Sequence, residues 1–439
     1  MSEFRFDGRT AIVTGPAGGL GFAHAQLLAA RGASAAGGRG GEHGTAVAPI
    51  GRTGRTLMSV EKARTTAEAL RFEVRAVAES EIRPHIQRAD TERTIVAEIR
   101  DALSRAGCFG RTIPVAYGGR GDSLRAFIIQ QEELARVWPT AAVAATWTNL
   151  SGLLLYRFGT PEQKDQLLRP LADGSNLGAI AWTEPQGGSN AAGLTTSATK
   201  VDGGWILNGS KRLIDNAQNA DFIIIGARTA EHANPHKSLS MFVLRRDDPG
   251  FEFGAAHDTI GLRAAGVGWF TVRDCFVPES RLLGELDRGF YQMMAMVELG
   301  RTGVAAICLG MAEGALRAAT DFLKTRSAGG RPLSGNDVIL ATVADMRVQI
   351  DAARALTDVA TSLADKGLRC TREAAMAKLY ASEVANDVAA RSLHLHGGIG
   401  FTTETVAHRF FCDSQAFSIG EGTSEVLRLI IGRAEFEAG

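Results

Sequence analysis

The chain has few cysteines, and none of them stands at the spacing of a disulfide framework. Its 439 residues include five cysteines, which are scattered as Cys108, Cys275, Cys308, Cys370 and Cys412. No Cys-x-x-Cys pair occurs, which is typical of proteins from reducing compartments. We therefore expect no structural disulfide.

An excess of charge and long apolar runs are missing as well. Lys plus Arg equals Asp plus Glu at 48 each, so no net charge draws the chain toward nucleic acid or anionic lipid. No stretch reaches the 18 uninterrupted apolar residues of a membrane span, and the N-terminus lacks the pattern of a signal peptide. We expect a cytoplasmic enzyme with no nucleic-acid partner and no membrane partner.

Metal ligands are also sparse. His394 and His396 stand close together, but no further Cys or His follows at ligand spacing, so we expect no metal site. A Gly-x-Ser-x-Gly nucleophile motif is absent too, because the fifth position around Ser189 is Ala191.

The pattern of apolar residues changes twice along the chain. Helical spacing begins at about Glu61, short β-rich runs begin at about Ile180, and long helical periodicity returns after Gly289. With 45% hydrophobic residues the chain can bury a large core. We predict four parts. They are a short, truncated N-terminal unit plus linker in 1–60, a helical domain in 61–178, a β domain in 179–284 and a second helical domain in 285–439.

A glycine-rich segment, Thr14-Gly-Pro-Ala-Gly-Gly-Leu-Gly21, lies near the N-terminus. A short strand is expected before it at residues 11–13 and a helix after it at 20–31. It resembles the opening of a short-chain dehydrogenase/reductase, where a pyrophosphate sits on the helix N-terminus. We expect no second strand, because residues 32–44 are mostly small, and no tyrosine is followed four residues later by lysine. We interpret the segment as a truncated Rossmann-like remnant, with a linker over 33–54.

Six short motifs follow one another on the helical, β, helical layout. Each combines small or glycine residues with polar side chains, and each alone is a weak signal. In this order they resemble the acyl-CoA dehydrogenase family from about Glu61 to the C-terminus. The motifs are Thr183-Glu-Pro-Gln-Gly-Gly-Ser189, Leu207-Asn-Gly-Ser-Lys211, Val277-Pro278, Ala377-Lys-Leu-Tyr-Ala-Ser-Glu383, His396-Gly-Gly-Ile-Gly-Phe401 and Gly420-Glu-Gly-Thr-Ser-Glu425.

The resemblance implies an α+β fold with an N-terminal helical domain, a β-barrel-like middle domain and a C-terminal four-helix bundle. It also implies FAD-dependent α,β-dehydrogenation of an acyl-CoA thioester, in fatty acid or lipid metabolism. Glu421 matches the base that removes the α-proton. The position of an alternative family base, just before Arg301, is Gly300. The competing interpretation of Glu421 is a loop carboxylate near a helix start.

Other residues match family contacts to FAD and to the substrate. Thr183 and Ser189 could instead cap turns, and Glu298 with Arg301 could instead form an exposed i,i+3 ion pair. The candidate FAD contacts are Thr183, Ser189, Ile214, Asp215, Arg326, His394, Gly397, Gly398 and Thr423, and the candidate substrate contacts are Glu298, Arg301, Gly422 and Arg433.

The chain departs from the family pattern beside the flavin. Leu213-Ile214-Asp215 stands where the family usually has Trp-Ile-Thr or Trp-Ile-Ser. An ionised Asp215 about 4 Å from a reduced anionic flavin would repel it by about 4 kcal/mol at an effective dielectric near 20. That corresponds to a potential lower by about 90 mV. Either Asp215 is protonated or turned away, or the flavin is tuned differently here.

A second group of departures concerns FAD contacts that family members take from a neighbouring subunit. Arg326 is present, but Gly329, Asp337 and His394 stand at the other positions, and Cys412 replaces a common Arg. We therefore expect either a homotetramer or a hetero-oligomer with a related subunit.

The resemblance implies electron-transfer flavoprotein as the electron acceptor. Two alternatives remain open at this stage: a flavin-poor partner subunit of a hetero-oligomer, and a flavin monooxygenase on the same fold. Gly420, where many relatives carry an aromatic residue, favours a wide acyl cavity.

Overall fold

The computed structural model describes residues 10–12, 34–36 and 54–437, with side chains from Thr66 onward. The chain divides into two compact units, Met1–Ala63 and Arg64–Gly439. In the first unit, β1 (Thr10–Ile12) pairs in parallel with β2 (Ser34–Ala36).

The expected first strand is thus present, but the expectation that no second strand follows was wrong. A parallel ladder uses backbone groups, so the small side chains of Ser34, Ala35 and Ala36 can form it without β-branched residues. The linker interpretation fails at the same residues. The glycine-rich segment and the helix expected after it lie outside the described residues.

Helices make up the N-terminal part of the second unit, and the first of them begins before it. The expectation that helical structure starts at about Glu61 was wrong, since α2 begins at Gly54. Proline opens α6 and α7, where its missing N–H costs nothing, and Thr160 with Gln163 forms a capping box at α7. The helices are α2 (Gly54–Val77), α3 (Ile86–Glu92), α4 (Ala97–Arg105), α5 (Leu124–Ala135), α6 (Pro139–Phe158) and α7 (Pro161–Ala172), with single turns at Ala78–Ile82, Arg83–His85 and Val115–Tyr117.

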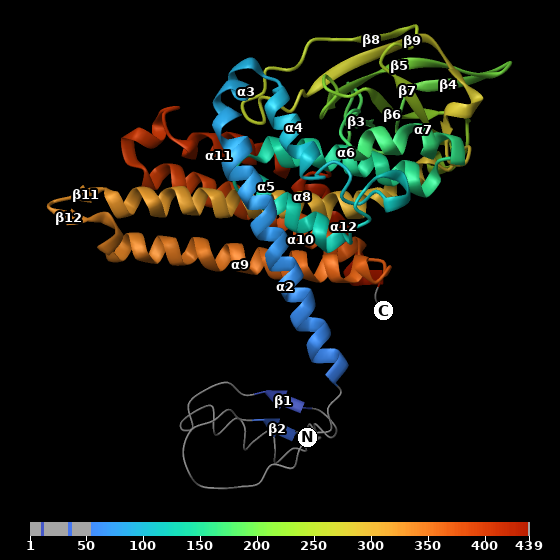
Figure 1. Ribbon diagram of the computed structural model, residues 1–439. Helices are drawn as coiled ribbons and strands as arrows, with labels where there is room; N and C mark the ends of the chain where they lie inside the picture. The colour runs from blue at the N-terminus through green and yellow to red at the C-terminus, as the bar shows by residue number, and fades with distance from the viewer. Residues whose placement is uncertain (1–9, 13–33, 37–53, 438–439) are drawn as a thin grey trace. The chain divides into compact units, whose positions relative to one another are not determined.

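The middle part is an eight-stranded sheet, in which strands run in the order β10-β7-β6-β4-β5-β9-β8 and β3 pairs with β6. Figure 1 shows it at the opposite side of this unit from α9. A register shift interrupts the β5–β9 pairing between Arg212 and Ile214, and such bulges re-aim side chains. The strands are β3 (Gly178–Ala181), β4 (Ser197–Val201), β5 (Gly204–Ile214), β6 (Phe222–Arg228), β7 (Leu239–Arg245), β8 (Phe251–Phe253), β9 (Gly268–Pro278) and β10 (Leu282–Leu283).

Three long helices dominate the C-terminal part and run side by side in Figure 1. They are α8 (Gly289–Thr325), α9 (Asp337–Asp365) and α10 (Thr371–Leu395), followed by α11 (Val406–Ser414) and α12 (Ser424–Glu437). The short β11 (Ser327–Ala328) and β12 (Arg331–Pro332) join α8 to α9, and single turns occur at Leu333–Gly335, Gln415–Ser418 and, as a longer 3-10 segment, Gly397–Phe401.

The long helical periodicity predicted after Gly289 is confirmed by α8, α9 and α10. The apolar residues of α9 are not all buried, because Met346 and Ile350 are fully buried while Val359 is 51% exposed. The expected order of helical, β and helical parts is also confirmed.

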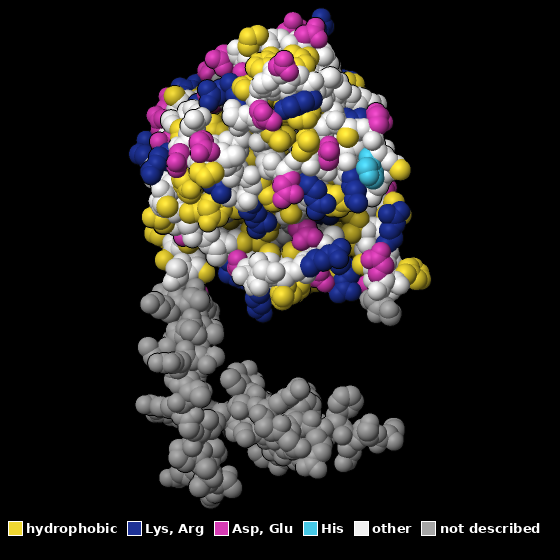
Figure 2. All heavy atoms as spheres, turned by 90° about the vertical axis from the view of Figure 1, so that its right-hand side faces the viewer, with side chains coloured by type: hydrophobic (Ala, Val, Ile, Leu, Met, Phe, Trp, Pro, Cys, Tyr) yellow, Lys and Arg dark blue, Asp and Glu magenta, His cyan; other side chains and the backbone are white. Residues whose placement is uncertain are grey.

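α8 is the only described helix whose length and hydropathy would permit a membrane crossing, although 78% of that stretch is buried within the fold. A buried core helix passes the same test, so this is weak evidence for a membrane span. Figure 2 shows Lys and Arg interspersed with Asp and Glu over the visible face of the molecule.

Candidate active site

Glu421 lies in the short loop that precedes α12, in an unusual backbone conformation. Its φ is +55°, and that of Gly422 is +94°. A non-glycine residue in the left-handed region costs about 1–3 kcal/mol and persists only where the surroundings enforce it. The side chain is partly buried. The loop therefore needs contacts that hold it.

Two buried cations supply these contacts. Lys378 Nζ donates to the carbonyl oxygen of Gly422 at 2.6 Å, and Arg301 Nε donates to that of Glu421 at 3.4 Å. Lys378 is fully buried and Arg301 is 8% exposed. Sequence reasoning placed Arg301 in the site but missed Lys378. The available signal was a lysine inside a motif on a helix face otherwise lined by alanine.

Burial raises the pKa of Glu421 above its ordinary value. The positive charges of Arg301 and Lys378 oppose this rise, while the negative charge of Asp215 adds to it. A carboxylate with a raised pKa is suited to accept a proton near neutral pH.

Gly300 lies directly beside the Glu421 carboxylate. A Cβ at Gly300 would approach Glu421 Oε2 to 3.2 Å and Cδ to 3.4 Å. The space that an alternative base would need on α8 is therefore the space beside the loop carboxylate. The absence of a side chain at Gly300 and the presence of Glu421 complement each other.

Asp215 faces the same site and is bonded rather than turned out to solvent. Trp147 Nε1, on α6, donates to Asp215 Oδ2 at 3.1 Å. Burial raises the pKa of Asp215 to about 6, against the opposing effect of the Trp147 bond. Leu213, next to the bulge in β5, has a φ of +56° and is 57% exposed, while Ile214 is buried.

Glu298 and Arg301 do not form the exposed i,i+3 ion pair that was the alternative interpretation, because no ion pair joins them among the described residues. Glu298 instead accepts hydrogen bonds from the Thr371 hydroxyl and, at 3.8 Å, from the Cys370 thiol. Arg301 points away from solvent toward the Glu421 loop. The two side chains therefore serve different parts of the structure.

The motif that begins at Thr183 is held by a buried ion pair. Lys211 Nζ lies 2.8 Å from Glu184 Oε1, and both side chains are at most 1% exposed. Backbone N–H groups of Thr195 and Thr196 donate to the same carboxylate at 2.7 and 2.9 Å. This fixes the loop that carries the Thr183 and Ser189 hydroxyls.

Those two hydroxyls form no hydrogen bond within the part of the chain that the structure describes, so neither caps a turn. Thr423 does act as a cap, since its hydroxyl accepts from Val426 N at 3.3 Å at the start of α12. The hydroxyls of Thr183 and Ser189 are thus available to a ligand.

The remaining candidate FAD contacts lie far from Glu421. Arg326 follows the last residue of α8, 25 residues beyond Arg301, which is about 38 Å along a helix axis. His396 stacks on Phe322 at 4.7 Å, so the glycine segment after it lies at the same end. Arg326, His394, Gly397 and Gly398 are exposed there, while Arg433 is exposed on α12. The structure therefore separates the candidates into two groups.

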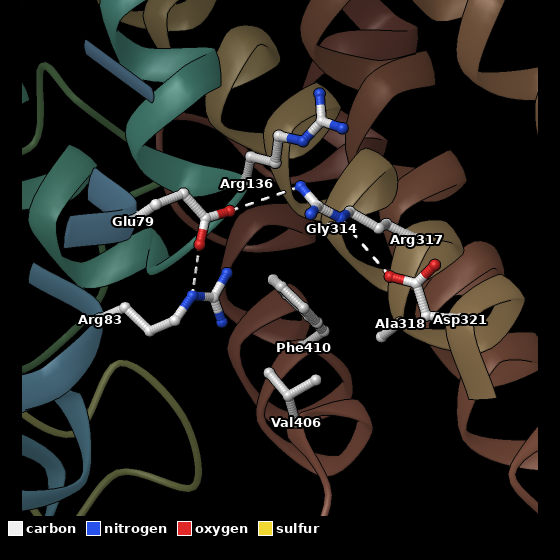
Figure 3. A pocket seen from close by; sticks show the side chains of 9 residues that line it. All are labelled: Glu79, Arg83, Arg136, Gly314, Arg317, Ala318, Asp321, Val406 and Phe410. Carbon is white, nitrogen blue, oxygen red and sulfur yellow. Dashed lines mark hydrogen bonds and ion pairs between the residues drawn. The ribbon is translucent and has the colours of Figure 1, made fainter. Parts of the chain in front are cut away.

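Two cavities lie outside the loop of Glu421. One of about 310 Å³ lies beside the Thr183 motif and includes Pro185, Lys211 and Arg212 in its lining. The other, of about 290 Å³, contains none of the expected site residues. Figure 3 shows it between Arg136, the ion-paired Glu79 and Arg317, and Phe410.

Three family models match the chain in succession. They are the acyl-CoA dehydrogenase N-terminal domain at residues 64–175, the middle domain at 179–275 and the C-terminal domain at 287–436. Among curated proteins, the probable acyl-CoA dehydrogenase YngJ of Bacillus subtilis is 34% identical over 83% of this chain and 97% of the relative. The caffeyl-CoA reductase-Etf complex subunit CarC of Acetobacterium woodii is 35% identical over 76% of this chain and 88% of the relative.

Solved structures agree with these matches. Butyryl-CoA dehydrogenase from Megasphaera elsdenii superposes with a TM-score of 0.81 at 33% identity, covering 84% of this chain and 98% of that one. A glutaryl-CoA dehydrogenase from Mycobacterium smegmatis in complex with FADH2 gives a TM-score of 0.80 at 26% identity, covering 84% and 94%.

Proposed function

The chain belongs to the acyl-CoA dehydrogenase family, and we propose that Glu421 is the base of its FAD-dependent α,β-dehydrogenation of acyl-CoA thioesters. The observation that carries this assignment is the partly buried carboxylate of Glu421, whose pKa is raised and whose loop is held by two buried cations. Bound FAD supplies the acceptor for the hydrogen that leaves the β-carbon.

The residues present fit the flavin ring in part. The unbonded hydroxyls of Thr183 and Ser189 offer hydrogen-bond donors, and the exposed side chain of Leu213 offers an apolar surface. Ile214 and Asp215 follow on the same strand end. Thr423 is engaged as a helix cap, so its contact would come through its remaining lone pair or its own O–H.

Glu421 removes the α-proton of the substrate in this proposal. Its backbone N–H would bond the thioester carbonyl, as the family resemblance implies, and so acidify that proton. The positive charge of Arg301 keeps part of Glu421 in the ionised form that a base requires. Glu298, Gly422 and Arg433 are the further substrate contacts we propose.

The direct test replaces Glu421 by Gln. Turnover should fall by at least about 10²–10⁴-fold, the contribution of a positioned general base, while the flavin band in the visible spectrum should persist. Glu435→Gln is the matched control, because Glu435 is an exposed carboxylate on α12 that accepts a hydrogen bond from Arg372 at 3.5 Å. Near-normal turnover of Glu421→Gln would sink the assignment.

The substrate class can be read from the same protein under anaerobic conditions. Addition of a panel of acyl-CoA thioesters should bleach the flavin band only with accepted chains. We propose that the chain accepts branched or ring-bearing acyl groups, because a Cβ at Gly420 would meet only the Ala416 carbonyl, at 3.5 Å. A Gly420→Tyr variant should lose these chains first, and a strong wild-type preference for short straight chains would contradict the idea.

We also propose that a complete FAD site needs two subunits. The group around Glu421 lies beside Arg301, while the group of Arg326, His394, Gly397 and Gly398 lies at the C-terminal end of α8, about 38 Å farther along the helix axis. One chain therefore cannot bring both groups to one cofactor. A flavin-loaded homotetramer in mass measurements supports self-assembly. A colourless protein that takes up no FAD would instead favour the hetero-oligomer with a related subunit.

Electron-transfer flavoprotein is the acceptor that we propose, and a relative named as a subunit of an Etf complex supports it. Reduction of added electron-transfer flavoprotein by substrate and enzyme tests this step. Rapid oxidation of the reduced protein by oxygen, with a hydroxylated product, would favour the monooxygenase alternative.

A further inference from the structure

The motif from Ala377 to Glu383 carries Lys378, one of the two buried cations that contact the Glu421 loop. We propose that Lys378 is a positioning residue for Glu421: it holds the base loop in its left-handed turn and supplies the positive charge that keeps the carboxylate ionised. This inference rests on the proposed role of Glu421 and adds a residue to it.

Among the described residues, the ammonium group of Lys378 forms one hydrogen bond. The side chain is fully buried on α10, and its neighbours on that helix, Ala374, Ala377 and Ala381, are buried as well. That bond runs from Nζ to the Gly422 carbonyl at 2.6 Å. A lysine buried only as packing would need no such short charged contact, and an apolar side chain would fill the same space more cheaply.

The bond acts on the backbone next to the base. Arg301 holds the carbonyl of Glu421 and Lys378 holds the next carbonyl, that of Gly422. Two successive peptide groups are thus tied to α8 and α10, which fixes the positive φ values of both residues. Without Lys378, the Gly422 carbonyl loses this donor, and of the two bonds from buried cations only the longer one from Arg301 remains.

The charge of Lys378 acts on the carboxylate itself. The groups that face Lys378 are Cys308 and Arg301 on α8, Glu421 on the loop and Glu383 on its own helix. Burial lowers the pKa of Lys378 to about 8, and burial raises the pKa of the Cys308 thiol to about 12. Near neutral pH, Lys378 is therefore charged and Cys308 is not.

The groups that face Glu421 are Arg301, Lys378 and Asp215. Without the charge of Lys378, burial and Asp215 still raise the pKa of Glu421, and of the groups that face it only Arg301 lowers that pKa. The pKa of Glu421 must then rise, so a larger fraction of the base is protonated at neutral pH.

The test uses FAD-loaded enzyme and the variants Lys378→Met and Lys378→Gln. Lys378→Met should lower kcat/KM about 10- to 100-fold at pH 7, since small displacements of a catalytic group cost that much. The acid limb of the kcat/KM profile should move to higher pH. Lys378→Gln keeps a donor for the Gly422 carbonyl, so it should recover part of kcat while its acid limb stays displaced.

The control variant is Ser392→Ala on the same helix. Ser392 is buried and donates to the Ala315 carbonyl at 2.7 Å, so its loss also removes one buried hydrogen bond, 14 residues from Lys378. It should lower the unfolding temperature without moving the acid limb. A purely structural role for Lys378 predicts the same behaviour in Lys378→Met.

The proposal is overturned if both Lys378 variants keep the wild-type acid limb and lose no more kcat/KM than Ser392→Ala. If Lys378→Met does not fold, Lys378→Gln decides the question, together with Lys378→Arg, which should keep the limb in place. Failure of the proposed function looks different, because then Glu421→Gln retains turnover. An inactive Glu421→Gln with an unmoved limb in the Lys378 variants refutes this inference alone.

Discussion

Two buried lysines hold the two loops of the candidate site, and they do so with different partners. Lys211 in the β domain meets the carboxylate of Glu184 at 2.8 Å. Lys378 in the helical bundle meets a neutral carbonyl at 2.6 Å. Burial lowers the pKa of each lysine to about 8, so the two cations are similar and their partners are not.

Because their partners differ, Lys211 contributes mainly to stability and Lys378 mainly to the chemistry of the site. The charge of Lys211 is compensated by Glu184, and the pair fixes the Thr183 loop. In the described part of the chain no anion is bonded to Lys378, so its field reaches the nearby carboxylate of Glu421. A buried cation bonded to a carbonyl can tune a neighbouring acid, whereas one bonded to a carboxylate mainly anchors the chain.

We expect the largest effect from Lys211→Met, which tests whether Lys211 anchors the chain. It leaves Glu184 buried without its cation, which should cost about 3–5 kcal/mol in the free energy of unfolding. The double variant Lys211→Met with Glu184→Gln should recover much of that loss. Urea unfolding of the three proteins measures it, and a single variant as stable as wild type would show that Glu184 does not need the lysine.

Acid should weaken the same pair. Burial alone would raise the pKa of Glu184, but Lys211 and the bonds from Thr196 and Thr195 lower it to about 2. A lowered carboxyl pKa contributes stability above its ordinary value of 4.5, and this contribution is lost as pH falls toward about 2. Unfolding temperatures between pH 6 and pH 3 should therefore fall more steeply for wild type than for Glu184→Gln. Parallel curves would contradict the prediction.

Gly300→Ala tests how closely the Glu421 carboxylate is confined on the catalytic side. The added methyl would lie 3.2 Å from Glu421 Oε2, so the carboxylate must move by a few tenths of an ångström. We expect kcat to fall by about tenfold or less. Gly432→Ala, where a Cβ meets nothing within 4 Å, is the control. Equal kcat in both variants would mean that the carboxylate is not confined on this side.

The smallest expected effect comes from Asp215→Asn. The negative charge of Asp215 raises the pKa of Glu421, so its removal should move the acid limb of kcat/KM down by about one pH unit or less. The reduction potential of the bound flavin should rise in the same variant, most clearly above about pH 6, where Asp215 is ionised. A limb that moves upward would show that Asp215 acts through its Trp147 bond instead.

Much of the fold could be predicted because it depends on local patterns. Helical and strand periodicities predicted the order of the parts, and the six motifs pointed to the family that the comparisons show. β2 was missed because Ser34, Ala35 and Ala36 lack β-branched side chains, so the strand depends on its backbone pairing with β1.

The candidate site was predicted less completely, because some of its contacts join distant residues. Trp147 and Asp215 are 68 positions apart, and Lys378 meets Gly422 across 44. No local pattern reveals which lysine will be buried when three long helices pack. Glu421 was recognisable from its motif, but the pair of cations that hold its loop appears only in the folded chain.

The gap over Gly300 also limits how this active site can change through evolution. A base on α8 and a base on the loop would compete for one small volume, so a lineage cannot acquire the first while it keeps the second unchanged. A chain with both carboxylates would press two negative charges together, and one of them would have to hold a proton. Relocation of the base therefore requires two substitutions, and we expect a chain that carries only one of them to be poorly active.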